Sequence, residues 1–177
     1  MNTIERNSQK TIMNSNNHVI YMGFFSEDEQ KEIIKKRMKE GWIKAWFAIE
    51  AMAVSEEVVE NALKEHIEKL SKTKDTMLLE KKFSEIKEVP NPPREIEKAF
   101  SQVSEVTILT KDLFTLINIS ILFGPSAIEI LEPNESKIKI DEMQNIVNVV
   151  TGIIHRFASI GVGGIVMTTS DKRPGHE

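Results

Sequence analysis

The 177-residue sequence contains no cysteine, so disulfide bonds, thiolate zinc sites and cysteine nucleophiles are all excluded. It also lacks an excess of positive charge, because its formal net charge is −4 and its isoelectric point is about 5.7. Nucleic acids and anionic lipids attract basic surfaces. We therefore expect neither DNA nor a membrane as a partner of this chain.

The sequence has no apolar run long enough to cross a bilayer. The longest, LFTLINISILFG, is well short of the roughly 20 residues that a spanning helix needs, and it contains Asn118 and Ser120. Residues 1–22 lack the apolar segment of a signal peptide. These absences predict a cytoplasmic protein. The many Lys, Glu and Ile residues, together with the missing cysteine, are also typical of a thermophile.

Both ends of the chain are polar and show no sustained period. Residues 1–22 are rich in asparagine and predict a disordered tail, and residues 170–177 predict a second tail. Met22 could be the true start, because patterned sequence begins just after it. The hydrophobic fraction of 40% suits one core. We expect a single α+β domain over residues 23–169, with its core at about 42–132.

Two helices are predicted in the first half of the chain. Ser26 and Glu29 have the spacing of a capping box, which indicates a helix from Ser26 to about Lys39. Residues 56–71 repeat apolar side chains at helical spacing, with acidic residues at the beginning and lysines near the end.

Two further helices are predicted in the second half, and both are rich in apolar residues. The first covers residues 111–123, opens at Thr110 and is apolar nearly all round. The second is long, covers residues 142–160, and begins at a capping box formed by Asp141 and Gln144. One sheet can cover only one side of such helices. We expect them to pack on each other or on a partner subunit.

The segment WIKAWFAIEAMAV at residues 42–54 is ambiguous between strand and helix. Its strict alternation favours a strand, and Ser55 after it suits a strand that leads into a new helix. We therefore predict a strand. Other strands are expected at residues 76–89, 99–110 and 126–132, and short ones are candidates at 136–140 and 165–169.

The resulting order of strand, helix, strand, strand, helix, strand resembles the ferredoxin-like βαββαβ sandwich. In that α+β fold the first and third strands are central, which suits the apolar first strand and the charged second one. An N-terminal helix and a long C-terminal helix are additions. The stretches EIKEVPNPPREIEKAFSQV and FGPSAIEILEP also resemble a group of small uncharacterised archaeal proteins. That resemblance implies no activity.

No convergent catalytic group emerges from the sequence, and we assign no catalytic residue, metal site or cofactor. Glu129 and Glu132 are three apart, so in the expected strand their side chains point to opposite faces and do not converge. No two histidines have the spacing of metal ligands. The candidates for ligand or interface contacts are Trp42, Trp46, Asn148, Thr151 and His155.

The leading hypothesis is a non-catalytic cytoplasmic module that forms a homo-oligomer and has room for a small ligand at a subunit boundary. Excess apolar surface on the two C-terminal helices is its basis. One alternative is a small enzyme that uses His155 and Arg156 with a glutamate from the sheet. Another is single-stranded RNA binding on the sheet face that carries Trp42 and Trp46.

Overall fold

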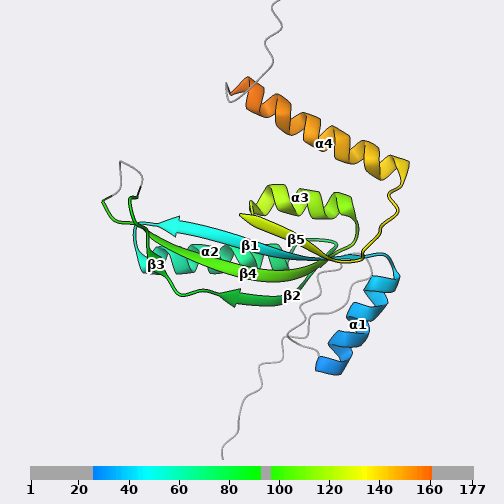
Figure 1. The fold of residues 1–177 in the computed structure, drawn as a ribbon, viewed down its shortest axis with the longest axis horizontal. Coiled ribbons are helices and arrows are strands. Elements are labelled where there is room, and N and C mark those ends of the chain that lie inside the picture. Colours follow the sequence, from blue (N-terminus) through cyan, green and yellow to red (C-terminus); the bar gives the residue numbers. More distant parts are fainter. Residues whose placement is uncertain (1–25, 93–96, 161–177) are drawn as a thin grey trace, which may run out of the picture. The chain divides into compact units, whose positions relative to one another are not determined.

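The computed structural model describes residues 26–92 and 97–160 (Figure 1). The elements of this part of the chain are α1 (Glu27–Lys39), β1 (Ile43–Ala53), α2 (Glu56–Ser71), β2 (Thr76–Phe83), β3 (Lys87–Glu88), β4 (Phe100–Thr110), α3 (Leu113–Phe123), β5 (Ala127–Glu132) and α4 (Ile140–Ser159). The chain divides into two compact units, one that ends at Lys137 and one that begins at Ile138. The single domain expected over residues 23–169 therefore stays a prediction.

The strands form one antiparallel sheet in the order β2-β4-β1-β5, and β3 also pairs with β4. The first strand and the third long strand are thus central, and the second and fourth are at the edges. This is the predicted ferredoxin-like arrangement, and the α+β fold class is confirmed. The strand predicted at residues 42–54 is confirmed as β1, and its helical alternative was wrong.

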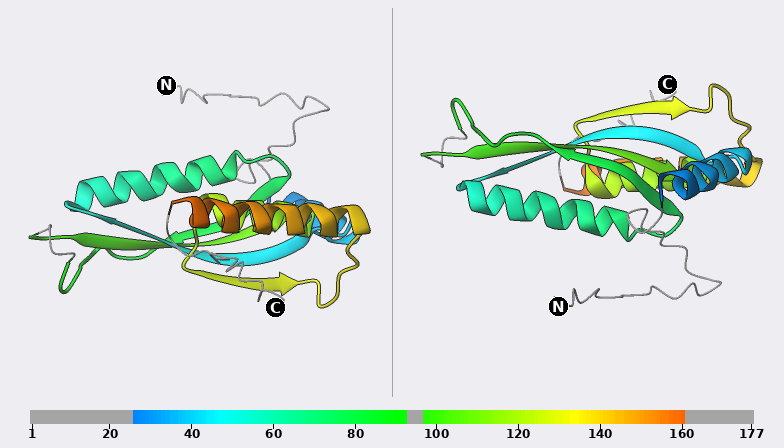
Figure 2. Two further views of the ribbon diagram at one scale, coloured as in Figure 1. Left: turned by 90° about the horizontal axis from the view of Figure 1, so that it is seen from above. Right: turned by 90° about the horizontal axis from the view of Figure 1, so that it is seen from below.

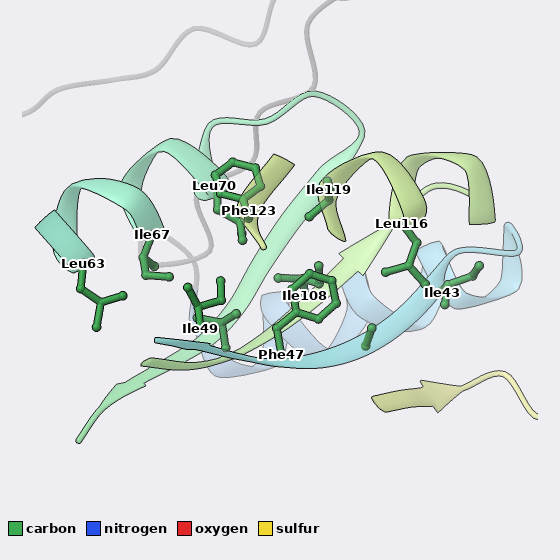
Figure 3. Packing of buried hydrophobic residues seen from close by; sticks show 12 residues of the cluster. Ile43, Phe47, Ile49, Leu63, Ile67, Leu70, Ile108, Leu116, Ile119 and Phe123 are labelled. Atoms are coloured by element: carbon green, nitrogen blue, oxygen red, sulfur yellow. The ribbon is translucent and has the colours of Figure 1, made fainter. Parts of the chain in front are cut away.

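The helices α2 and α3 contribute to one core on the same face of the sheet (Figures 2 and 3). The alternation of β1 sends Ala45, Phe47 and Ile49 into this core, where each is buried. The cluster also takes apolar side chains from α2, α3 and β4: Leu63, Ile67, Leu70, Leu116, Ile119, Phe123, Val106 and Ile108.

The capping box predicted for the first helix is present. The Glu29 amide donates to the Ser26 hydroxyl at 3.3 Å, and the Ser26 amide donates to the Glu29 carboxylate at 2.8 Å. The hydrogen bonds that the Ser26 amide and then the Ser26 hydroxyl donate to the Glu29 carboxylate hold the pKa of Glu29 below its usual value. The local sequence therefore determines where α1 begins.

The starts of α3 and α4 differ from the predictions. Asp112, not Thr110, caps α3, because its extended backbone lets its carboxylate accept the Thr115 amide at 2.8 Å. Helix α4 begins at Ile140 after Lys139, with no hydrogen bond from a capping side chain. Asp141 therefore lies inside the first turn, where a carboxylate still interacts favourably with the helix dipole.

Some of the predicted strands also differ from the strands in the structure. The strand expected at residues 76–89 is interrupted and becomes β2 and β3, and residues 136–139 form no strand. The tails at 1–22 and 170–177 and the candidate strand at 165–169 lie outside the described residues. None of the helices in the described part of the chain has the length and hydropathy that crossing a bilayer requires.

Ser104 on β4 is fully buried in the structure, and its hydroxyl has no hydrogen-bond partner among the described residues. A buried polar group without a partner loses its bonds to water and gains none in return. We therefore expect Ser104→Ala to raise the free energy of unfolding by about 1 kcal/mol, measured by urea denaturation. Ser101→Ala, on the opposite face of the same strand, is the matched control and should change little. A destabilised Ser104→Ala would contradict this account.

Candidate functional site

The sheet face opposite α2 and α3 is covered at one end by α1. Trp42, Met77 and Leu109 are buried there and pack against apolar side chains of α1, namely Ile33, Ile34 and Met38. The Arg37 guanidinium lies over the Trp42 ring, 4.8 Å from its centre. Trp42 is only 5% exposed. It was a candidate for ligand or interface contacts, but in this structure it is a core residue beneath the first helix.

Trp46 lies on the same face, four residues further along the chain in β1, and is half-buried. The sheet register places Thr107 of β4 on one side of it and Glu129 of β5 on the other. This candidate therefore lies beside an accessible edge strand, since every residue of β5 is exposed.

A bulge in β5 changes the expected placement of two glutamates. Lys44 pairs with Glu132, whereas Ala45 pairs with Ile130, so one residue of β5 is extra. Lys44 and Trp46 share a face of β1, so their partners Glu132 and Glu129 share that face too. The prediction that these carboxylates point to opposite faces was wrong. The period of two that it assumed is interrupted at the bulge.

The charges near Trp46 are mainly acidic. The Lys44 ammonium forms an ion pair with Glu132 at 3.2 Å. Glu129 and Glu105 lie on the same face as the indole, and Lys82 of β2 pairs with Glu105 in the sheet register. Single-stranded nucleic acid needs a positive groove beside the aromatic platform. This setting disfavours a phosphate backbone, and the RNA-binding hypothesis gains no support from it.

The remaining candidates, Asn148, Thr151 and His155, lie on α4 in the second unit. Their spacing of three and four residues places them on one side of the helix, and all three are exposed. The Gln144 amide donates to the Asn148 side-chain oxygen at 3.1 Å. These residues therefore form a polar border beside the apolar side chains of α4. Trp42 and Trp46 belong to the other unit.

His66 has a structural role. Its Nε2 lies 3.0 Å from the Phe123 carbonyl oxygen at the end of α3, and the two rings meet edge to face at 5.0 Å. A carbonyl only accepts, so Nε2 is the donor. This bond satisfies a carbonyl that the end of a helix leaves without an intrahelical partner. His66 is therefore a hydrogen-bonded, partly buried side chain that joins α2 to the end of α3.

In the described ranges, no group of three or more His, Asp and Glu residues is placed to hold a metal ion. A family model, that of the MJ0538 family, matches residues 44–171. The chain belongs to the MJ0538 family. This is an uncharacterised family named after an archaeal protein. No curated protein and no solved structure matches the chain significantly.

The MJ0538 match reaches across both compact units. It begins inside β1 at Lys44 and includes α2, α3 and α4, so that Trp46, Asn148, Thr151 and His155 fall within it. Both stretches that suggested archaeal relatives, residues 85–103 and 123–133, are also inside the match. Helix α1 and Trp42 precede it. Membership in the MJ0538 family thus agrees with the suspected resemblance and adds no activity to it.

Sequence reasoning missed the exposed apolar side chains of β5 on the first unit. Ile128 and Ile130 lie on the face of β5 that corresponds to the core side of β1, because they pair with Phe47 and Ala45. They are nevertheless 46% and 54% exposed. Ile121 and Leu122 at the end of α3 are exposed as well. The alternation of AIEILE was the available signal, but it indicates which residues share a face and not whether that face is covered.

Proposed function

We propose that this chain is a non-catalytic cytoplasmic module whose function depends on self-association. The observation that carries the proposal is exposed apolar surface on both units. In the second unit no residue of α4 is buried, although its apolar residues repeat at helical spacing. In the first unit, the end of α3 and the strand β5 expose isoleucine and leucine side chains. Soluble monomers rarely leave large contiguous patches of this kind in water.

A subunit boundary on α4 would also provide a place for a small ligand. Asn148, Thr151 and His155 border the apolar side chains of α4 and offer an amide, a hydroxyl and an imidazole. Ligand sites combine mostly apolar walls with a few polar groups. The polar border therefore supports a ligand held where two copies meet, as the finer part of the proposal.

Two measurements on the purified chain test this function. Sedimentation over a series of concentrations should show a reversible shift from monomer to a larger species, because apolar association follows mass action. Native mass spectrometry should give the mass of the same species and detect any ligand that copurifies. A chain that stays monodisperse and monomeric throughout the micromolar range would rule out self-association as the function.

A further inference from the structure

Six exposed apolar residues of α4 follow a strict spacing of three and four residues along the whole helix, and the partly buried Ile146, Val149 and Ile153 lie beside them on the apolar side. The six repeat every 3.5 residues on average, which is the period of a coiled-coil seam. A single straight helix has a slightly longer period of about 3.6 residues. All six are between 45% and 80% exposed. We call this set the α4 stripe: Ile140, Met143, Val147, Val150, Ile154 and Phe157. It extends along α4 from the first turn to the last.

We propose that the α4 stripe binds the α4 stripe of a second copy, with the two helices antiparallel about a two-fold axis. This inference rests on the proposed function of self-association and names the surface that carries it. The helix has 20 residues, so the contact would extend over about 30 Å. A second copy fits because the stripe is complementary to itself in one antiparallel register.

That register places the two-fold axis between Asn148 and Val149. A residue that lies a given number of positions before the axis then faces the residue of the second copy that lies the same number of positions after it. Every layer of the stripe is filled in this way, and the smallest side chains meet at the centre, where the helices approach most closely. The layers are Val147 with Val150, Met143 with Ile154, and Ile140 with Phe157.

The charges of α4 favour the same orientation. Its acidic residues Asp141 and Glu142 lie in the first turn, and its basic residue Arg156 lies in the last turn. Residues 143–154 contain no Asp, Glu, Lys or Arg. Antiparallel copies bring the acidic end of one helix to the basic end of the other and also oppose the two helix dipoles. A parallel pair would bring like charges together at both ends.

A lipid surface fits the same stripe less well. Helices that lie on anionic membranes carry several Lys and Arg residues on the polar side. Apart from Arg156, the polar side of α4 presents neutral and acidic residues such as Asn145, Asn148 and Asp141. The small and uncharged side chains that border the stripe, including Thr151, suit close contact between helices instead.

Val150→Asp tests the proposal with Asn145→Asp as its matched control. Both add one negative charge to α4, but Val150 is in the stripe and Asn145 is on the polar side. Because each dimer would bury two new carboxylates, we expect Val150→Asp to raise the dimer dissociation constant by roughly 100-fold or more in sedimentation equilibrium. Asn145→Asp should leave it unchanged. Far-UV circular dichroism verifies that both variants keep the helix.

Single cysteines test the orientation, since the natural chain has none. Oxidation of an equal mixture of Met143→Cys and Ile154→Cys should give mainly the mixed disulfide dimer. Met143→Cys alone should not cross-link to itself, because 11 residues of helix separate it from its facing position, about 16 Å. A disulfide requires Cα atoms within roughly 7 Å of each other.

The outcomes separate this inference from the proposed function. A dimer that Val150→Asp leaves intact, or a Met143→Cys that links only to itself, would overturn the antiparallel α4 pair but keep self-association. A wild-type monomer would overturn both. If that monomer were also destabilised by Val150→Asp and not by Asn145→Asp, the stripe would be covered by its own chain.

Discussion

Replacing Phe47 with alanine is expected to lower the free energy of unfolding by about 3–5 kcal/mol. Phe47 has no exposed surface and lies among Ile108, Leu116 and other side chains between the sheet and its helices (Figure 3). Truncation removes the buried ring and leaves a cavity that packed neighbours fill only in part. Small domains have a total stability of about 5–15 kcal/mol, so this variant should unfold at a much lower urea concentration.

Met52→Ala is the control for this effect. Met52 lies on the same strand, but it is 50% exposed on the opposite face of the sheet. Its truncation should change the free energy of unfolding by less than about 0.5 kcal/mol. Urea titrations followed by tryptophan fluorescence compare the two variants directly. Equal losses for Phe47→Ala and Met52→Ala would mean that the core does not lie between β1 and the helices.

Replacing Gly124 with alanine is expected to cost about 1–2 kcal/mol, although the new methyl group meets no atom within 4 Å. Gly124 ends α3 in the left-handed conformation, with φ 55° and ψ 49°, and its amide donates to Ser120. A side chain at this φ clashes with its own backbone. The cost is therefore conformational and should appear in urea unfolding. Asn tolerates this conformation better, so Gly124→Asn should lose less.

Gly152→Ala is expected to have the opposite effect and to stabilise its helix. Gly152 also has open space around its Cβ position, but it lies inside α4 and has no positive φ. Alanine at such a position favours the helix by roughly 0.5–1 kcal/mol. Far-UV circular dichroism should therefore show increased helicity. If Gly124→Ala and Gly152→Ala had effects of the same sign, the backbone conformation of Gly124 would not be the cause.

The helices show which structural features local sequence patterns predict correctly. Helix α2 occupies the predicted residues, and Ser26 caps α1 as expected, because both signals depend on residues within one or two turns. The predicted cap of α4 failed because the helix begins earlier, at Ile140, and the predicted cap of α3 failed because two neighbouring residues compete for the same role. Thr110 and Asp112 are both good caps, and the backbone at Asp112 determines which one is used.

The candidate residues show which structural features local sequence patterns cannot predict. Alternation correctly placed Trp42 and Trp46 on one face of the sheet, since that depends only on the strand period. It could not show that α1 covers Trp42 and leaves Trp46 half-buried. It also misplaced Glu132 relative to Glu129, because the bulge is defined by pairing with Lys44, which is 88 residues away in the chain.

The order of the main elements and the ferredoxin-like topology could be predicted from the amino-acid sequence, and Gly124 is the residue type that the left-handed end of α3 favours. Each of these follows from periodicity, caps and glycine, which operate over a few residues. The sequence could not show which surfaces are covered, because burial and strand register depend on contacts between segments far apart in the chain. The folded chain covers Trp42 with α1, buries Ser104 without a partner among the described residues, and leaves Ile128 and Ile130 exposed on β5.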